Sequence, residues 1–126
     1  LANVFAEWVR ELELRVVTAR PGEVVLALPV TPRHVHAGGV MCGQTLMAAA
    51  DTAMVLAVMT HLGAFRPMTT VQLQTSFLRP VPKDALSLAV IARVLRFGKS
   101  LSYGEVEFST SDRKLAAHST TTYTLL

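Results

Sequence analysis

The chain has 126 residues, of which 51% are hydrophobic and 17% charged, and its formal net charge is +3. This length suits one domain, residues 1–126, with a core of modest size, and the composition excludes a disordered chain. The twelve Lys and Arg residues form no run, which argues against a nucleic-acid groove, whereas a mild basic excess suits either an anionic small ligand or an ordinary surface.

The N-terminal third of the chain predicts a short helix followed by two strands. Residues 3–11 fit an amphipathic helix with four apolar residues on one face: Val4, Phe5, Trp8 and Val9. Residues 12–18 alternate apolar and polar side chains, as in a half-buried strand whose inward residues are Leu12, Leu14 and Val16. The motif RPGE at 20–23 predicts a turn into a second strand at 24–30, and a glycine-containing loop follows at 33–42.

Residues 43–61 are almost wholly apolar, which predicts a long buried helix that ends near Gly63. A membrane span needs about 20 apolar residues, and this stretch is shorter and carries Asp51 near its middle. A charge at the centre of a bilayer is unfavourable by roughly 3 kcal/mol. We therefore expect the core helix of a folded domain and no interaction with a membrane.

Four further strands are expected after this helix, at residues 69–78, 85–96, 101–110 and 114–126. In the first of them, Val71 and Leu73 share one face and Thr70 lies on the other. Short turns between strands favour antiparallel pairing. The expected fold class is therefore α+β, a curved antiparallel sheet of about six strands wrapped around one long central helix. Such a sheet has open edges, which favour edge-to-edge dimerisation.

Asp51 is the residue that most needs an explanation. Its helical neighbours three and four residues away are Met47, Ala48, Met54 and Val55, so no basic side chain on the helix pairs with it. An ionised carboxylate buried without a partner is costly. Asp51 is therefore either at an exposed corner or paired with a distant Arg, or it is a general base or nucleophile in apolar surroundings.

Gly43 begins the helix, where a free backbone N–H and the helix dipole favour negative charge. It is thus a candidate oxyanion donor, although a glycine there also simply permits a tight loop. Gly43 and Asp51 are eight residues apart, or about 12 Å along a helix axis. One carbonyl group cannot lie within hydrogen-bond distance of both, so if they serve one site they come from two chains of a two-fold dimer.

Other polar residues give weaker signals. His34 and His36 form an H-x-H pair without a third ligand at a clear spacing, so we expect no metal site. Cys42, the single cysteine, is either an activated thiol near a helix start or a packed one, and it suits a reducing compartment and a cytoplasmic protein. Arg79 and Lys99 lie at turns, where they are either solvated or in contact with phosphates.

The sequence contains no nucleotide-binding glycine motif, no serine-hydrolase elbow and no zinc spacing. Two stretches, HAGGVMCGQTLMAAADTA and VQLQTSFLRP, resemble hotdog-fold thioesterases of the PaaI-like (phenylacetate-degradation type) group, and the resemblance covers nearly the whole chain. In that group, an Asn or Gln and a His-Gly-Gly motif precede an acid nine residues after the His. A later strand ends in an aromatic residue, with Pro shortly after it.

The resemblance implies roles for four residues. It assigns the catalytic acid to Asp51 and the oxyanion donor to Gly43, with the two residues contributed by opposite subunits. It assigns the group that holds the thioester carbonyl to His36, and the group that orients the attacking water to Thr70.

The chain departs from the group's motif at three positions. Cys42 stands in place of the His, Gln44 in place of the second Gly, and His36 in place of the Asn or Gln. The methionines of the long helix are flexible enough to accommodate aromatic or aliphatic acyl groups. We expect five residues to contact substrate: Cys42, Gln44, Met47, Arg79 and Lys99.

The resemblance therefore implies an acyl-CoA thioesterase that works as a homodimer or homotetramer and needs no cofactor besides the coenzyme A of its substrate. Asp51 would either activate water or attack the thioester directly. Two alternatives stay open. One is a non-catalytic acyl-CoA-binding protein, and the other is an enoyl-CoA hydratase or dehydratase that pairs His36 with the acid.

Overall fold

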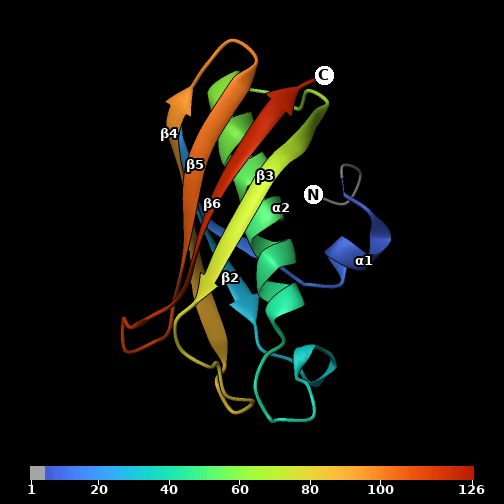
Figure 1. Ribbon diagram of the computed structural model, residues 1–126, viewed down its shortest axis with the longest axis vertical. Coiled ribbons are helices and arrows are strands. Elements are labelled where there is room, and N and C mark those ends of the chain that lie inside the picture. The colour runs from blue at the N-terminus through green and yellow to red at the C-terminus, as the bar shows by residue number, and fades with distance from the viewer. Residues whose placement is uncertain (1–4) are drawn as a thin grey trace.

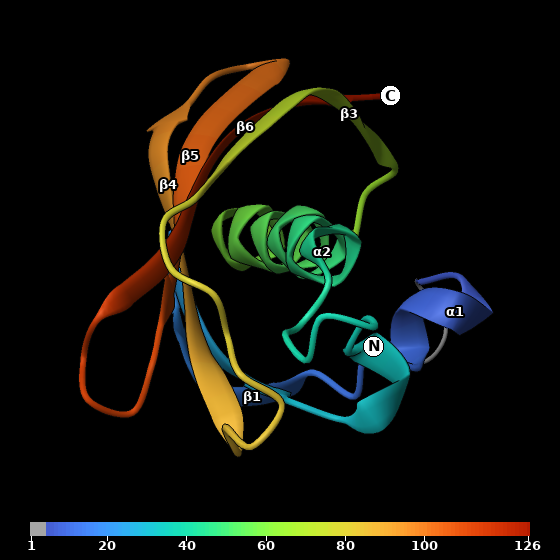
Figure 2. The ribbon, with the colours of Figure 1, turned by 60° about the horizontal axis from the view of Figure 1, so that its bottom comes forward.

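The computed structural model describes residues 5–126, which form one six-stranded antiparallel sheet curved around a long helix (Figures 1 and 2). In chain order the elements are α1 (Glu7–Arg10), β1 (Arg15–Arg20), β2 (Glu23–Pro29), the 3₁₀ turn η1 (Pro32–His34), α2 (Gly43–Leu62), β3 (Met68–Phe77), β4 (Ser87–Phe97), β5 (Leu101–Ser109) and β6 (Leu115–Leu125). The strand order is β1-β2-β4-β5-β6-β3, so β1 and β3 are the two edges of the sheet. The expected α+β fold is confirmed, and the bounds of α2 and of β2 to β6 agree with the expected ranges to within about two residues.

α2 lies inside the concave face of the sheet (Figure 2). Its buried positions include four alanines: Ala49, Ala50, Ala53 and Ala57. Small side chains let the strands come close to the helix. Gly104 of β5 takes part in this close approach, because a Cβ there would lie 2.4 Å from Cε of Met54 and 2.4 Å from the carbonyl oxygen of Arg93. As expected, the helix ends at Gly63, which has a left-handed φ of +75°.

By length and composition alone, α2 would be able to cross a membrane. However, half of its most apolar window is buried inside the fold, where it packs against β2 and β4. The core formed there includes Leu26 and Leu28 of β2, Val90 of β4 and Phe108 of β5. This packing agrees with the expectation that α2 is the core helix of a folded domain.

The N-terminal segment differs from the sequence-based expectation. α1 covers only four residues, and its Trp8 is 61% exposed instead of buried, while Val4 lies outside the described residues. β1 begins at Arg15 rather than at Leu12, because Glu13 adopts a positive φ of 59° that interrupts extended backbone. All of β1 is exposed, since it is an edge strand, and Val16 only lines an open groove beside the C-terminal half of α2.

A β-bulge in β3 changes which side chains face the helix. In the pairing of β3 with β6, Thr70 is opposite Tyr123 and Gln72 is opposite Thr122, so Val71 is the extra residue. The expectation that Val71 shares a face with Leu73 is therefore wrong: Val71 is 58% exposed, whereas Leu73 packs against the core. On the N-terminal side of the bulge the alternation is reversed, so Thr70 faces the helix instead of pointing away from it.

Candidate active site

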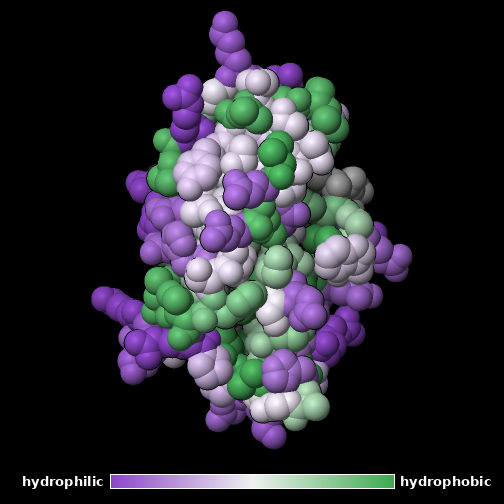
Figure 3. All heavy atoms as spheres, in the orientation of Figure 1, coloured by the Kyte–Doolittle hydropathy of each residue, from purple (hydrophilic) through white to green (hydrophobic). Residues whose placement is uncertain are grey.

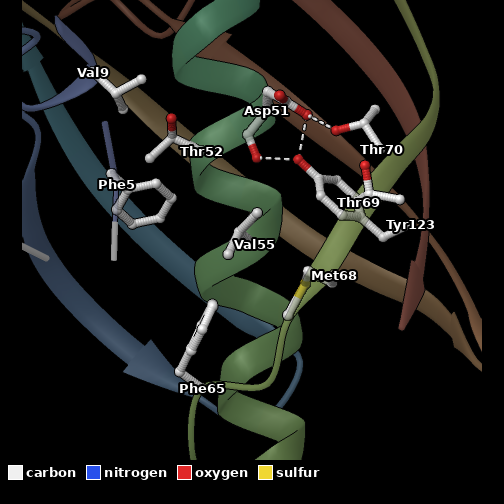
Figure 4. A pocket seen from close by; sticks show the side chains of 10 residues that line it. All are labelled: Phe5, Val9, Asp51, Thr52, Val55, Phe65, Met68, Thr69, Thr70 and Tyr123. Carbon is white, nitrogen blue, oxygen red and sulfur yellow. Dashed lines mark hydrogen bonds between the residues drawn. The ribbon is translucent and has the colours of Figure 1, made fainter. Parts of the chain in front are cut away.

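Asp51 lies in the third turn of α2, with its side chain directed toward β3 and β6 (Figure 4). Its Oδ1 accepts a hydrogen bond from Thr70 Oγ1 at 2.7 Å and another from the hydroxyl of Tyr123. Within residues 5–126, no Lys, Arg or His lies within ion-pair distance of this half-buried carboxylate. Neutral hydroxyl groups therefore take the place of the distant Arg that the sequence left open.

Tyr123 lies near the C-terminal end of β6, and its hydroxyl reaches Asp51. Its side chain is only 3% exposed, and its hydroxyl also lies 2.6 Å from the backbone carbonyl oxygen of Asp51. Burial and the neighbouring Asp51 carboxylate raise the pKa of this hydroxyl far above its usual range. Tyr123 therefore stays protonated at any pH at which the protein works, and it acts as a hydrogen-bond donor.

A cavity of about 240 Å³ opens beside Asp51. Its polar lining residues are Asp51, Thr52, Thr69, Thr70 and Tyr123. Its apolar side comes from three places, the N-terminal segment, α2 and the connection into β3, and consists of Phe5, Val9, Val55, Phe65 and Met68. The arrangement can place a polar reacting group against the carboxylate and an apolar group against the opposite wall.

A second cavity, of about 320 Å³, lies at the N-terminus of α2 and is lined in part by Gly43, Phe77 and Arg79. Within the described residues, no side chain caps the N-terminus of this helix, so the first backbone N–H groups are available to a ligand. Glycine at position 43 lets the ring of Phe77 lie against the helix start, because a Cβ would be 3.1 Å from Cζ of Phe77.

Among residues 5–126, the two cavities share no lining residue. Gly43 and Asp51 both belong to the unbroken helix α2, so they are about 12 Å apart along its axis. A single chain therefore does not bring the acid and the helix N-terminus to one reacting carbonyl.

The structure determines the tautomer of His36. Its Nδ1 accepts a hydrogen bond from the backbone N–H of Gly38 at 2.8 Å. In the neutral ring, the proton must therefore be on Nε2, which makes Nε2–H a donor. His36 lines neither of the two cavities described above.

Cys42 takes part in local hydrogen bonds at the start of α2. Its Sγ lies 3.0 Å from Oγ1 of Thr45, and that oxygen lies 3.2 Å from Nδ1 of His34. These contacts hold the loop before α2 against the first turn of the helix, which agrees with the packed interpretation of this thiol.

The remaining expected substrate contacts are widely spread. Gln44, Met47 and Asp51 lie at spacings of three and four residues on one face of α2, and Gln44 and Met47 are exposed. Arg79 lines the Gly43 cavity. Lys99 lies in the β4–β5 turn, two residues after Phe97. The ring of Phe97 stacks on that of His61, near the C-terminal end of α2, with a centroid distance of 4.7 Å. Within one chain, Lys99 is therefore at the opposite end of α2 from Gly43 and Arg79.

Tyr123 was not among the residues expected from the sequence. It lies in the run STTTYT, whose alternate residues Ser119, Thr121 and Tyr123 are buried. The sequence does contain a signal for this residue: alternate polar residues in a strand expected to pack on the helix that carries Asp51. It becomes specific only when the pairing of β6 with β3 places Tyr123 opposite Thr70.

The chain matches a known protein family and a curated relative. The profile of the family described as the Thioesterase superfamily matches residues 38–117. A candidate esterase of Thermoplasma volcanium is 34% identical over 106 residues, covering 84% of this chain and 77% of that protein.

Many solved structures share the fold, including those of two proteins from E. coli and Streptococcus mutans. The PaaI protein from the phenylacetic acid degradation operon of E. coli has a TM-score of 0.86 at 20% identity, covering 96% of this chain and 85% of its own. The smu.793 protein of Streptococcus mutans, solved bound to acetyl CoA, has a TM-score of 0.88 at 15% identity, covering 100% of this chain and 95% of its own.

Proposed function

The chain belongs to the thioesterase superfamily, and we propose that it hydrolyses an acyl-CoA thioester to a free acid and coenzyme A. The observation that carries this proposal is Asp51, a half-buried carboxylate without a cationic partner in residues 5–126, which two hydroxyl groups hold at the edge of a cavity. The candidate esterase from Thermoplasma and the acetyl-CoA complex of the Streptococcus protein support the reaction type and the coenzyme A group.

The active site forms between two copies of the chain. β3 is an open edge with exposed Val71 and Phe77, and Met47 and Leu78 are also exposed nearby. Figure 3 shows hydrophobic side chains among polar ones on the face where β3 and α2 lie. An unpaired edge strand is a template for pairing with another chain. If two β3 strands pair antiparallel with Leu73 opposite Thr75 of the partner subunit, the bulge at Val71 places Thr70 opposite Phe77 of the partner subunit.

This register joins the two cavities. Thr70 lines the Asp51 cavity and Phe77 lines the Gly43 cavity. Their apposition therefore brings the acid of one chain next to the helix N-terminus of the other. It provides the second chain that the 12 Å separation requires.

The chemistry follows from this arrangement. Asp51 removes a proton from a water molecule while the water oxygen attacks the thioester carbonyl carbon. The electron pair of the C=O bond moves to its oxygen, which the backbone N–H of Gly43 of the partner subunit stabilises. When the C=O bond re-forms, the C–S bond breaks, and the sulfur leaves with the proton that Asp51 had taken. The products are the free acid and coenzyme A.

The other site residues take supporting roles. Thr70 accepts a hydrogen bond from the attacking water while it donates to Asp51. Arg79 contacts the phosphates of coenzyme A from the Gly43 cavity. The apolar wall formed by Val55, Phe65 and Met68 accommodates the acyl group.

The test is hydrolysis of a panel of acyl-CoAs, from acetyl to aromatic acyl groups, by the wild-type protein and by Asp51→Asn. General acid–base catalysis contributes about 10²–10⁴-fold, so kcat should fall by this amount in the variant. Equal rates in the two proteins would refute the proposal. Tight binding of acyl-CoA without turnover by the wild type would select the non-catalytic alternative, and hydration of an enoyl-CoA would select the hydratase.

A further inference from the structure

The second oxygen of Asp51 differs from the first in its hydrogen bonding. Thr70 from β3 and Tyr123 from β6 both donate to Oδ1. Within residues 5–126, no protein donor lies within hydrogen-bond distance of Oδ2. The two oxygens of one carboxylate therefore have different surroundings.

Tyr123 is well placed to keep this asymmetry. Its ring is almost completely buried between α2 and the sheet, so the hydroxyl has little freedom to turn away. The hydroxyl has one proton and two acceptors, Oδ1 and the backbone carbonyl oxygen of Asp51, and it spans the side chain and the backbone of the same residue. Such a three-centre contact fixes the side-chain torsion of Asp51 relative to the helix.

We propose that Tyr123 is a positioning residue, which together with Thr70 occupies Oδ1 of Asp51 and so directs Oδ2 alone to the attacking water. This inference rests on the proposed thioester hydrolysis. Its basis is the convergence of two hydroxyl donors, from two neighbouring strands, on one oxygen of an acid that lines a cavity. Removing the hydroxyl leaves the acid, the cavity and the Thr70 contact in place, but one donor instead of two then holds the carboxylate.

The first experiment compares Tyr123→Phe with Tyr103→Phe. Tyr103 is the other tyrosine of the chain; it lies on β5 and is exposed, so it is a matched control. Small errors in the placement of a catalytic group cost up to about 10²-fold, so kcat of Tyr123→Phe should fall by about 10- to 100-fold while KM changes by less than about twofold. A variant that keeps the wild-type kcat, or one whose kcat falls only in proportion to its loss of folded protein, overturns the proposal.

A second measurement separates positioning from general structural support. If Tyr123 acts through Asp51, Tyr123→Phe should cause no further loss of residual kcat in the Asp51→Asn background, because the two changes are then not additive. An independent structural role would lower kcat again by the same factor as in the wild type.

A third readout does not depend on hydrolysis. In proton NMR, the buried hydroxyl of Tyr123 should give a slowly exchanging downfield signal that disappears in Tyr123→Phe and moves in Asp51→Asn. If the wild type hydrolyses no acyl-CoA but this signal behaves as described, the proposed function fails and the hydrogen bond from Tyr123 stands. If the signal is missing or does not respond to Asp51→Asn, the positioning role fails even in an active enzyme.

Discussion

Asp51 shows how an acid is kept on an apolar helix with no cationic partner among residues 5–126. An arginine beside it would neutralise the charge, and it would also compete with substrate for the carboxylate oxygens. Hydroxyl donors from Thr70 and Tyr123 satisfy one oxygen and leave the net charge unchanged. The acid could be identified from its apolar neighbours in the sequence, whereas its hydroxyl donors come from strands 19 and 72 residues away and depend on the sheet pairing.

The proposed role of the Gly43 N–H as oxyanion donor can be tested by substitution, because proline has no backbone N–H. Gly43→Pro eliminates the N–H at the first position of the helix, where proline is well tolerated, and the preceding Cys42 already has the extended ψ of 146° that a proline requires. Loss of one oxyanion donor costs about 10²–10³ in kcat.

The control for this change is Gly43→Ala. It keeps the N–H and adds only a methyl group, which meets the exposed ring of Phe77. We expect kcat of Gly43→Ala to stay within about tenfold of the wild type, well above the range given for loss of an oxyanion donor. Equal losses in the alanine and proline variants would show that the effect is steric and that the N–H plays no part.

At the level of elements, the hydrophobic pattern predicts α2 and most strands well, because long apolar and alternating stretches are insensitive to single irregularities. β3 is the instructive exception. Strict alternation places Thr70 on the outer face, and the bulge at Val71 reverses it, since one extra residue shifts every side chain before it to the other face. Likewise, the positive φ of Glu13 shortens β1, and nothing in the local sequence signals it.

The contact between β5 and α2 leads to a prediction about stability. Gly104→Ala places a Cβ 2.4 Å from a backbone oxygen of β4, which cannot move without breaking the sheet, so we expect a loss of about 2–3 kcal/mol in the free energy of unfolding. Gly63→Ala meets no atom within 4 Å and bears only the strain of its positive φ, about 1 kcal/mol. Urea unfolding of both variants checks this order, and a smaller loss in Gly104→Ala than in Gly63→Ala would contradict the close packing.

At the level of the whole molecule, the fold separates the two halves of the proposed chemistry. The acid lies halfway along α2 and the proposed oxyanion donor at its N-terminus, in cavities that share no residue in the described part of the chain. The rise per residue of a helix already requires this separation, so the need for two chains could be predicted from the sequence. The proposed meeting of the two cavities could not be predicted, because the proposal depends on β3 being an open edge with Thr70 and Phe77 near its two ends.

The most direct test of the shared site is a hybrid dimer. Asp51→Asn and Gly43→Pro chains carrying different affinity tags are co-expressed, and the mixed dimer is isolated by successive purification on both tags. One of its two sites then has a wild-type Asp51 and a wild-type Gly43 from opposite chains, so the hybrid should recover about half of the wild-type kcat per dimer although each parent is nearly inactive. A hybrid no more active than its parents would contradict an active site shared between two chains.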